Sequence, residues 1–472
     1  MNLNLKHIIS DIRFWIILFF VVRLIGITNP PLEVSHNWRQ TTVTMVARNF
    51  LEVDNNILYP RVDFAGEKTG ITGMEFPIFN YLIYTVSEVF GYAHWYGRLI
   101  NLIFSSFGLW FFYLLIKKYF KPDVAFNATI ILLFSIWFSF SRKIMPDTFS
   151  MSLIISCIYF GSNYLENKGN PNKFWNLILY TLLLTLGALA KLPSAYILIV
   201  FLILFLDKEI STQRKLFFSI ASFLAIIPVT IWYFYWFPHL VSTYDFWHFS
   251  MGKSLSEGAT EIIEQLPLAL ERFYNNALKY IGFFVFIVGL SFSIIKKNKA
   301  LLAIFGLSFI GYLIIILKAG QIFTHHNYYI IPFVPIMALI AGYGLSQIKN
   351  KKIVITLLIV IAAEGVLNQQ HDINIHTKSI ALLDLEQHLN SVSNKDDLIL
   401  INSNDYPTPI YFSHHKGWSL SNEKINNKSN VEELKVKGLK HIIILKKVFG
   451  TAIQLDYPVS FNNENYTIYK IV

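Results

Sequence analysis

The chain has 472 residues, of which 54% are hydrophobic and only 15% are charged, and its formal net charge is +10. This composition excludes a disordered chain and an ordinary soluble protein, because neither combines so much apolar sequence with so little charge. A mean hydropathy of +0.46 instead indicates a polytopic membrane protein. The single cysteine, Cys157, lies in an apolar run, so neither a disulfide nor a thiolate metal site is expected.

About eleven apolar segments are long enough to be candidates for crossing the bilayer hydrocarbon, which is about 30 Å thick. They lie at residues 14–28, 99–116, 124–140, 148–164, 174–190, 193–206, 215–237, 280–295, 300–317, 328–346 and 353–367. The segment 193–206 is short and follows Lys191, so it and its predecessor form either two spans or one broken span. Residues 1–27 resemble a signal sequence without a cleavage site, which predicts a retained first span.

Lysine and arginine residues gather in the loops on the same side as the amino terminus. The positive-inside rule therefore places the amino terminus in the cytoplasm and the last hundred residues outside. Residues 76–92 are also apolar, but Asn80, Tyr84, Ser87 and Glu88 recur at helical spacing. A twelfth span there would invert every later loop, so we predict an amphipathic helix at the membrane interface.

Three regions outside the membrane differ from simple connectors. The first outer loop, residues 28–98, is long and rich in charge, and we expect two interfacial helices in it. Residues 238–279, with Gly252 and Gly258, predict a mobile outer loop. From residue 368 onward polar residues increase and apolar runs shorten, which is typical of a small extracytoplasmic α/β domain. The sequence thus predicts a membrane domain at 1–367 and an α/β domain at 368–472, with helices near 378–391 and 430–436 and strands at 398–401, 441–445 and 467–472.

The first outer loop holds the most informative polar residues. His36, Arg39 and Gln40 lie at positions i, i+3 and i+4, so they share one face of a predicted helix. Asp63 and Glu75 follow in the same loop. These residues are either solvated surface charges that pair with one another, or the wall of an outward cavity for an anionic, lipid-borne substrate.

Further polar residues lie at the outer ends of later spans. They are Arg98, Arg142, Lys143, Asp147, Lys191, His325, His326, Tyr328 and Tyr329. Ionisable groups near the membrane are costly, so a group of them at one leaflet usually marks a substrate path. Lys191 could instead extend its amine to the interface. Adjacent histidines alone lack the spacing of a metal site, although His36 with His325 and His326 remains an alternative ligand set.

Two classes of partner are not expected. The glycines of the first loop match no nucleotide-binding spacing, which argues against a soluble nucleotide sugar or ATP as direct substrate. The aromatic residues fit lipid-facing packing and interfacial belts, so we predict no nucleic-acid partner.

Four short motifs in chain order resemble the GT-C membrane glycosyltransferases. They are His36–Gln40, Pro60–Asp63, Glu75–Pro77 and Gly97–Leu99. The chain most resembles the bacterial branch related to the protein O-mannosyltransferases and the lipid A aminoarabinose transferase, over roughly residues 10–345. This resemblance implies a donor sugar on a polyprenyl phosphate, an outward-facing active site and an inverting transfer. It also implies that His36 and Asn37 replace an acidic pair of the relatives, and that Glu75 replaces a lysine.

The expected chemistry limits the roles of these residues. Inverting transfer needs a base for the acceptor proton and cations for the departing phosphate. The base is either His36, oriented by Glu75 or Asp63, or one of these carboxylates directly. Arg39, Arg98 and Lys191 are the candidates for the phosphate, with Arg142 behind them. The other candidate substrate contacts are Gln40, Asp147, His326, Tyr328 and Tyr329.

We therefore predict a bacterial inner-membrane glycosyltransferase that moves a sugar from undecaprenyl phosphate to a glycolipid, a surface polysaccharide or a protein. The chemistry requires no cofactor, and nothing in the sequence supports a divalent metal. One alternative is a polymerase or ligase that moves a whole lipid-linked glycan. Another is a flippase for such a glycan, but a transporter is expected to carry its polar residues near the bilayer midplane.

Overall fold

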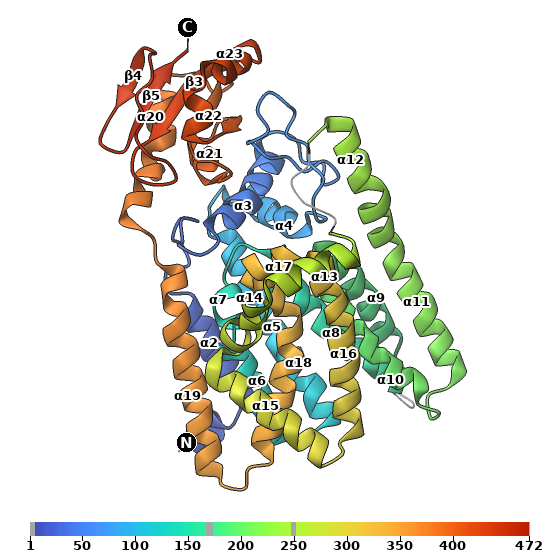
Figure 1. Ribbon diagram of the computed structural model, residues 1–472. Helices are drawn as coiled ribbons and strands as arrows, with labels where there is room; N and C mark the ends of the chain where they lie inside the picture. The colour runs from blue at the N-terminus through green and yellow to red at the C-terminus, as the bar shows by residue number, and fades with distance from the viewer. Residues whose placement is uncertain (1–4, 167–172, 247–251, 472) are drawn as a thin grey trace. The chain divides into compact units, whose positions relative to one another are not determined.

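The computed structural model describes residues 5–166, 173–246 and 252–471 (Figure 1). These residues form two compact units. The helical unit comprises Met1–Ile27, Arg98–Phe234 and Ser250–Gln370, and the mixed unit comprises Thr28–Gly97, Tyr235–Phe249 and His371–Val472. The first outer loop was predicted to belong with the membrane spans, but it lies in the mixed unit.

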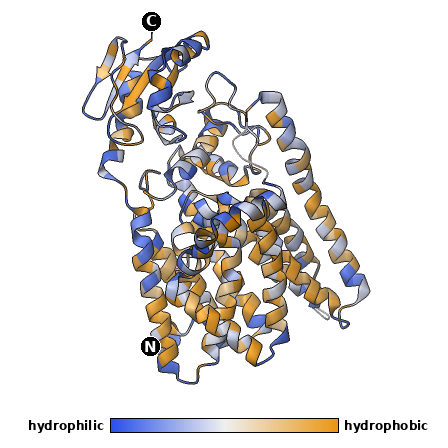
Figure 2. Ribbon diagram, in the orientation of Figure 1, coloured by the Kyte–Doolittle hydropathy of each residue, from blue (hydrophilic) through white to orange (hydrophobic). Residues whose placement is uncertain are grey.

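The helical unit is built from apolar helices, as Figure 2 shows by the hydrophobic colour along most of their length. Its closest helix pairs are α8 with α9, α6 with α18 and α15 with α18. The helices are α1 (Leu5–Ile9), α2 (Ile12–Arg23), α5 (Tyr96–Tyr119), α6 (Pro122–Phe134), α7 (Trp137–Phe140), α8 (Pro146–Glu166), α9 (Lys173–Ala190), η1 (Leu192–Val200), α10 (Phe201–Leu206), α11 (Thr212–Ile231), α13 (Leu255–Glu264), α14 (Leu266–Glu271), η3 (Arg272–Ala277), α15 (Lys279–Ile295), α16 (Lys299–Ala319), α17 (Gln321–His325), η4 (Asn327–Phe333), α18 (Val334–Ser346) and α19 (Lys351–Gln369).

Several of these helices can cross a membrane. Among the described residues, five helices are long and apolar enough, and a pair bent by 96° at residues 277–279 makes a sixth. Four shorter apolar helices lie at Ile78–Phe90, Pro122–Phe134, Phe174–Ala190 and Leu192–Leu206. The all-α membrane fold is thereby confirmed, whereas the number of eleven spans stays a prediction.

The apolar stretch around Lys191 is a broken helix. Helix α9 ends at Ala190, and η1 begins at Leu192 with Pro193 in its first turn. Between them Lys191 has an extended backbone, with φ −161° and ψ 100°. Proline is tolerated in a first helical turn but not within a helix, so the chain must restart there. Lys191 therefore belongs to neither α9 nor η1.

Residues 238–279 contain more helix than the predicted outer loop. Helix α11 continues through a π-helical turn, η2 (Trp232–Trp236), into α12 (Phe237–Tyr244), and α13, α14 and η3 follow. Gly258 lies in α13, where a Cβ atom would come within 1.7 Å of the carbonyl oxygen of Leu317. This glycine therefore serves a close approach between α13 and α16. Residues 247–251 lie outside the described part of the chain, and the mobility of the segment stays a prediction.

The mixed unit carries the two predicted helices of the first outer loop, α3 (Asn37–Glu52) and α4 (Ile78–Phe90), which pack against each other. Its sheet has the strand order β2-β1-β3-β5-β4, in which β1 is parallel to β2 and β3, and β5 is antiparallel to β3 and β4. The remaining elements are η5 (Gln370–Ile373), η6 (Thr377–Asp384), α20 (Leu385–Asn390), β1 (Leu398–Ile401), α21 (Thr408–Ser413), β2 (Gly417–Ser419), α22 (Asn422–Asn426), α23 (Lys428–Val436), β3 (Leu439–Leu445), β4 (Val459–Asn462) and β5 (Tyr466–Lys470). The small α/β domain is confirmed.

The first outer loop and the carboxy-terminal segment share one apolar core. Val46 and Phe50 of α3 belong to the same buried cluster as Leu385 and Ile399. The loop also extends the sheet at its β2 edge, because the Gly417 amide donates to the Asp63 carbonyl (3.0 Å) and the Gly66 amide donates to the Gly417 carbonyl (2.8 Å). The helices that carry the predicted site residues of this unit are therefore fixed by residues more than 300 positions further along the chain.

Candidate functional site

Arg39 and Glu75 form a buried ion pair in the mixed unit. Arg39 lies in the first turn of α3, and its Nη2 donates to Oε1 of Glu75. The arginine side chain is 3% exposed and the glutamate side chain 14%. A buried pair of this kind holds both charges in fixed positions, because removing either partner leaves the other uncompensated. The predicted proximity of Arg39 and Glu75 is thus present.

His36 and Gln40 lie close to this pair along the helix. His36 occupies the position before α3 in a left-handed conformation, with φ 63°. Gln40 is buried and its Nε2 donates to Oε2 of Glu33 at 3.1 Å. Glu33, which is fully buried, was not among the predicted site residues. Its signal was an isolated acidic residue between apolar neighbours, directly before a helix start.

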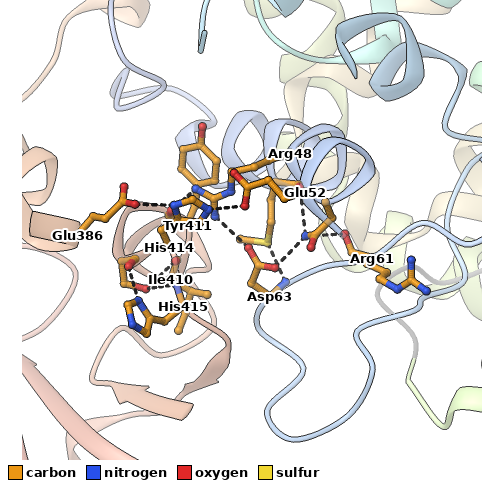
Figure 3. A network of polar contacts seen from close by, with 12 residues as sticks. Arg48, Glu52, Arg61, Asp63, Glu386, Ile410, Tyr411, His414 and His415 are labelled. Atoms are coloured by element: carbon orange, nitrogen blue, oxygen red, sulfur yellow. Dashed lines mark hydrogen bonds and ion pairs between the residues drawn. The ribbon is translucent and has the colours of Figure 1, made fainter. Parts of the chain in front are cut away.

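Asp63 belongs to a different ion pair near the other end of α3 (Figure 3). Its carboxylate accepts hydrogen bonds from Nη2 of Arg48 (3.0 Å) and Nδ2 of Asn49 (2.8 Å). Nine residues separate Arg39 from Arg48, which is about 13 Å along a helix. Glu75, and not Asp63, is therefore the carboxylate beside Arg39.

Arg48 connects this loop to the carboxy-terminal segment. Its Nη1 donates to the carbonyl of Tyr411 (3.0 Å), and its guanidinium lies 4.6 Å from the Tyr411 ring centroid. Burial lowers the pKa of Arg48, but the Asp63 carboxylate together with Tyr92 and Tyr411 outweighs it, so the pKa is raised above its ordinary value. The arginine is therefore always charged, and its contacts indicate a role in folding.

His414 lies between two carboxylates in the same network (Figure 3). Its Nδ1 is 2.6 Å from Oε1 of Glu386 and its Nε2 is 2.7 Å from Oε2 of Glu52. Burial lowers the pKa of His414, but the hydrogen bonds to Glu386 and Glu52 outweigh it, so the pKa is raised. Burial raises the pKa of Glu52, but the hydrogen bond to His414 together with the positive charges of His414, Arg48 and Lys395 outweighs this, so the pKa of Glu52 is lowered. The His414 imidazole thus links α3 to α20.

In the helical unit, Asp147 and Lys191 form a second buried ion pair. Asp147 lies in the first turn of α8, after Pro146, and its Oδ1 accepts from Nζ of Lys191. The aspartate side chain is 2% exposed and the lysine side chain 13%. The other carboxylate oxygen, Oδ2, is buried and has no hydrogen-bond partner among the described residues. That oxygen can accept a hydrogen bond from a ligand.

Aromatic rings surround the lysine of this pair. Nζ of Lys191 lies 4.8 Å from the ring centroid of Tyr328 and 5.5 Å from that of Tyr329. The two tyrosines stack with centroids 5.1 Å apart, and His326 stacks on Tyr328 at 5.3 Å. We call these five residues the Asp147 cluster. The sequence predicted every member of it, and the structure brings them together.

Arg142 and Arg98 lie elsewhere in the helical unit, at the end of the segment after α2. Arg142 donates from Nη1 to the Ile25 carbonyl (2.6 Å) and from Nη2 to the Gly26 carbonyl (2.8 Å). Nη1 of Arg98 donates to the Ile27 carbonyl at 3.2 Å. Both arginines are almost fully buried. Carbonyls at a helix end are natural partners for cations, so these contacts fix the first helix.

The described residues contain no group of three or more metal-ligating side chains close enough to hold an ion. Metal dependence stays open to experiment.

The fold and these ion pairs define a helical membrane protein with buried charges and a mixed α/β unit. A family model and several solved structures match this chain. Residues 75–232 match a family model described as dolichyl-phosphate-mannose-protein mannosyltransferase. This segment contains Glu75, Arg98, Arg142, Asp147 and Lys191. No curated protein matches the chain by sequence.

Solved structures show the fold. The apo structure of ArnT from Cupriavidus metallidurans matches with a TM-score of 0.68 and 11% identity, covering 97% of each chain. The same protein bound to undecaprenyl phosphate matches with a TM-score of 0.61 and 12% identity, covering 97% of this chain and 98% of that one. An Archaeoglobus fulgidus oligosaccharyltransferase matches with a TM-score of 0.59 and 11% identity, covering 91% and 67%. The resemblance to the GT-C glycosyltransferases is therefore confirmed, and the chain has the ArnT fold.

Proposed function

We propose that the protein is a membrane glycosyltransferase that moves a sugar from a polyprenyl phosphate to an acceptor on the outer face of a bacterial inner membrane. The observation that carries the proposal is the Asp147 cluster, in which a buried carboxylate, a cation and two stacked tyrosines meet at one helix break. This set suits a ligand that has hydroxyl groups and a phosphate, and the cluster lies in a chain with the ArnT fold.

The residues of the cluster have complementary roles in this proposal. Lys191 binds the phosphate and stabilises the negative charge that develops on it as the sugar leaves. The free Oδ2 of Asp147 accepts a hydrogen bond from a sugar hydroxyl, which orients the ring. Tyr328 and Tyr329 provide a flat surface beside the lysine, and His326 extends it.

The Arg39–Glu75 pair supplies the acid–base step. A carboxylate of Glu75, or His36 oriented by it, accepts the proton of the acceptor hydroxyl or amine as the new bond to the anomeric carbon forms. The bond between this carbon and the phosphate oxygen breaks, and its electron pair remains on the phosphate. Attack from the opposite side inverts the configuration. Arg39 holds the carboxylate in place.

The donor is proposed to be an undecaprenyl phosphate sugar, because ArnT has been solved with undecaprenyl phosphate and this chain shares its fold. The acceptor is a glycolipid, a surface polysaccharide or a protein. With the amino terminus in the cytoplasm, as the loop charges predict, the mixed unit lies outside the membrane. No cofactor is needed for this chemistry.

The test is sugar transfer in vesicles supplied with a labelled polyprenyl phosphate sugar. Glu75→Gln and Asp147→Asn each keep the side-chain shape and remove the charge, and we expect transfer to fall about 100-fold or more. Asp54→Asn is the matched control, because Asp54 is a half-exposed carboxylate of the same loop that pairs with Arg61. Unchanged transfer in both Glu75→Gln and Asp147→Asn would refute the assignment.

The oligosaccharyltransferase match favours one second candidate, a ligase that transfers a whole glycan. Donor size distinguishes the two functions. A transferase of single sugars accepts a monosaccharide donor, whereas a ligase requires the oligosaccharide. Movement of labelled donor across the membrane without a change in its linkage would instead support a transporter.

A further inference from the structure

A cavity lies in the α/β part of the mixed unit. It has a volume of about 460 Å³ and opens where β1 and β3 begin and β5 ends, next to the segment after α20. Its polar lining consists of Ser391, Ser393, Asn394, Asp397, Lys440, His441 and Lys470. The volume is within the range of small-molecule sites, about 300–1,000 Å³. None of these residues belongs to the Arg39–Glu75 pair, the Arg48–Asp63 pair or the Asp147 cluster.

His441 presents a buried polar atom that lacks a partner. The residue is 2% exposed and its Nε2 lies 3.5 Å from Oδ2 of Asp397. Its Nδ1 is buried and has no hydrogen-bond partner among the described residues. Burial lowers the pKa of His441, and Asp397 opposes this only in part, so the imidazole is neutral near pH 7. With its proton on Nε2 toward Asp397, Nδ1 is an acceptor for a hydroxyl group.

Buried polar atoms are normally hydrogen-bonded, so an unpaired one on the wall of a cavity indicates a missing ligand. Asp397 is not the partner of Nδ1. Its Oδ2 accepts a hydrogen bond from the Asn394 amide (2.8 Å) and faces the other ring nitrogen, Nε2. The histidine therefore lines the cavity with one nitrogen facing Asp397 and one buried nitrogen that has no partner among the described residues.

Two lysines lie beside the histidine: Lys440 precedes it on β3, and Lys470 lies on the neighbouring strand β5. Lys470 is directly opposite His441 in the β3–β5 pairing, and the Ile471 amide donates to the Lys440 carbonyl at 2.8 Å. Both lysines are exposed, and neither forms an ion pair with another part of the chain that the structure describes. Two ammonium groups with a single carboxylate nearby make the mouth of the cavity positive, which favours an anion.

We propose that this cavity binds a sugar residue that carries an anionic group, a carboxylate or a phosphate, within the acceptor glycan. Lys440 and Lys470 bind the anionic group, and Nδ1 of His441 accepts a hydrogen bond from a ring hydroxyl. The proposal rests on the proposed glycosyl transfer, because it assigns the acceptor's chemistry. It gives the mixed unit a function of its own, which is to select charged glycans.

The experiment measures equilibrium binding by titration calorimetry on the full chain in lipid nanodiscs. The probes are glucuronate, glucose 6-phosphate and glucose, which separate a carboxylate, a phosphate and a neutral sugar. We expect one or both charged sugars to bind at least about tenfold more tightly than glucose. The double variant Lys440→Ala/Lys470→Ala is expected to lose this preference, since two partly exposed charge contacts contribute about 1–2 kcal/mol together.

Lys428→Ala is the matched control, because Lys428 is an exposed lysine of the same domain outside the cavity. It should bind as the unchanged protein does. The proposal is overturned if the charged sugars bind no more tightly than glucose, or if Lys428→Ala weakens their binding as much as the double variant. Because all variants change only exposed lysines, loss of folding does not confuse the result.

The outcome is separable from that of the proposed function. The binding measurement uses no donor, so Glu75→Gln should bind the charged sugars normally even though it loses transfer. Loss of transfer without charged-sugar binding would retain the glycosyltransferase and reject only this acceptor site.

Discussion

Helix α3 carries two buried arginine–carboxylate pairs, and their surroundings give them different roles. Arg39 pairs with Glu75 near the start of the helix, whereas Arg48 pairs with Asp63 and also binds the Tyr411 carbonyl. The sequence pointed to three of these residues, Arg39, Asp63 and Glu75, because charged residues next to predicted membrane spans are conspicuous. It gave no signal for Arg48, since its partners lie 15 and 363 positions away.

Replacing Arg48 tests its structural role. In Arg48→Leu the buried carboxylate of Asp63 loses its cation, so we expect the free energy of unfolding to fall by about 3–5 kcal/mol. The control is Arg61→Ala, which removes a more exposed pair with Asp54 and should cost about 1 kcal/mol or less. Thermal unfolding of the purified protein measures both. Equal losses would show that Arg48 is not buried in this pair.

At the scale of elements, prediction from sequence succeeded where a single strong signal acts. The apolar segments, the break at Lys191 and strands β1, β3 and β5 follow from hydrophobic runs and from Pro193. Strands β2 and β4 were missed because they are short and lie at the sheet edges, with little apolar pattern. Within 238–279 the structure contains several helices, whereas Gly252 and Gly258 had suggested a mobile loop with one amphipathic stretch near 260–275.

Gly258 shows why that inference failed, and it provides a test. A Cβ atom at this position would clash with the Leu317 backbone, so Gly258→Ala should force α13 away from α16 and cost about 1–3 kcal/mol. A Cβ atom at Gly306 on α16 would meet no other atom within 4 Å, so Gly306→Ala should be neutral or stabilising by about 0.5–1 kcal/mol. Melting temperatures compare the two variants, and similar values for both would contradict the close approach.

For the molecule as a whole, the division of the chain into two units was the hardest feature to predict. Sequence composition changes near residue 368, but it does not reveal that the first outer loop shares a core with the segment beyond. Likewise, the members of the Asp147 cluster were predicted as separate polar residues at span ends. Their contacts depend on packing between helices far apart in the sequence, which no local pattern encodes.

The His414 link predicts a pH dependence of stability. Its pKa is raised in the folded state, so its contribution is complete below about pH 6.5 and is lost as the pH rises through the folded pKa. The pKa values of Glu52 and Glu386 are lowered, so their contributions are present above about pH 4.5 and are lost as the pH falls through their folded values. The Arg48 charge lowers the pKa of His414 in part, and Arg48 and Lys395 both lower the pKa values of Glu52 and Glu386.

We therefore expect the melting temperature to be about 2–4 °C higher at pH 5.5 than at pH 8.5. His414→Asn is the test variant, because asparagine tolerates the left-handed backbone of this position, where φ is 54°. The variant should lose the difference between the two pH values. A difference that persists in His414→Asn would assign it to other groups.

The core shared by the first outer loop and the carboxy-terminal segment has a consequence for biosynthesis. The ribosome makes α3 and α4 early, but their packing partners leave it last. Until then, the apolar faces of both helices are uncovered, and a growing chain needs the membrane surface or a chaperone to shield them. A nascent protein that stops before residue 371 should consequently be cleared by proteases, even though most of its membrane helices are complete.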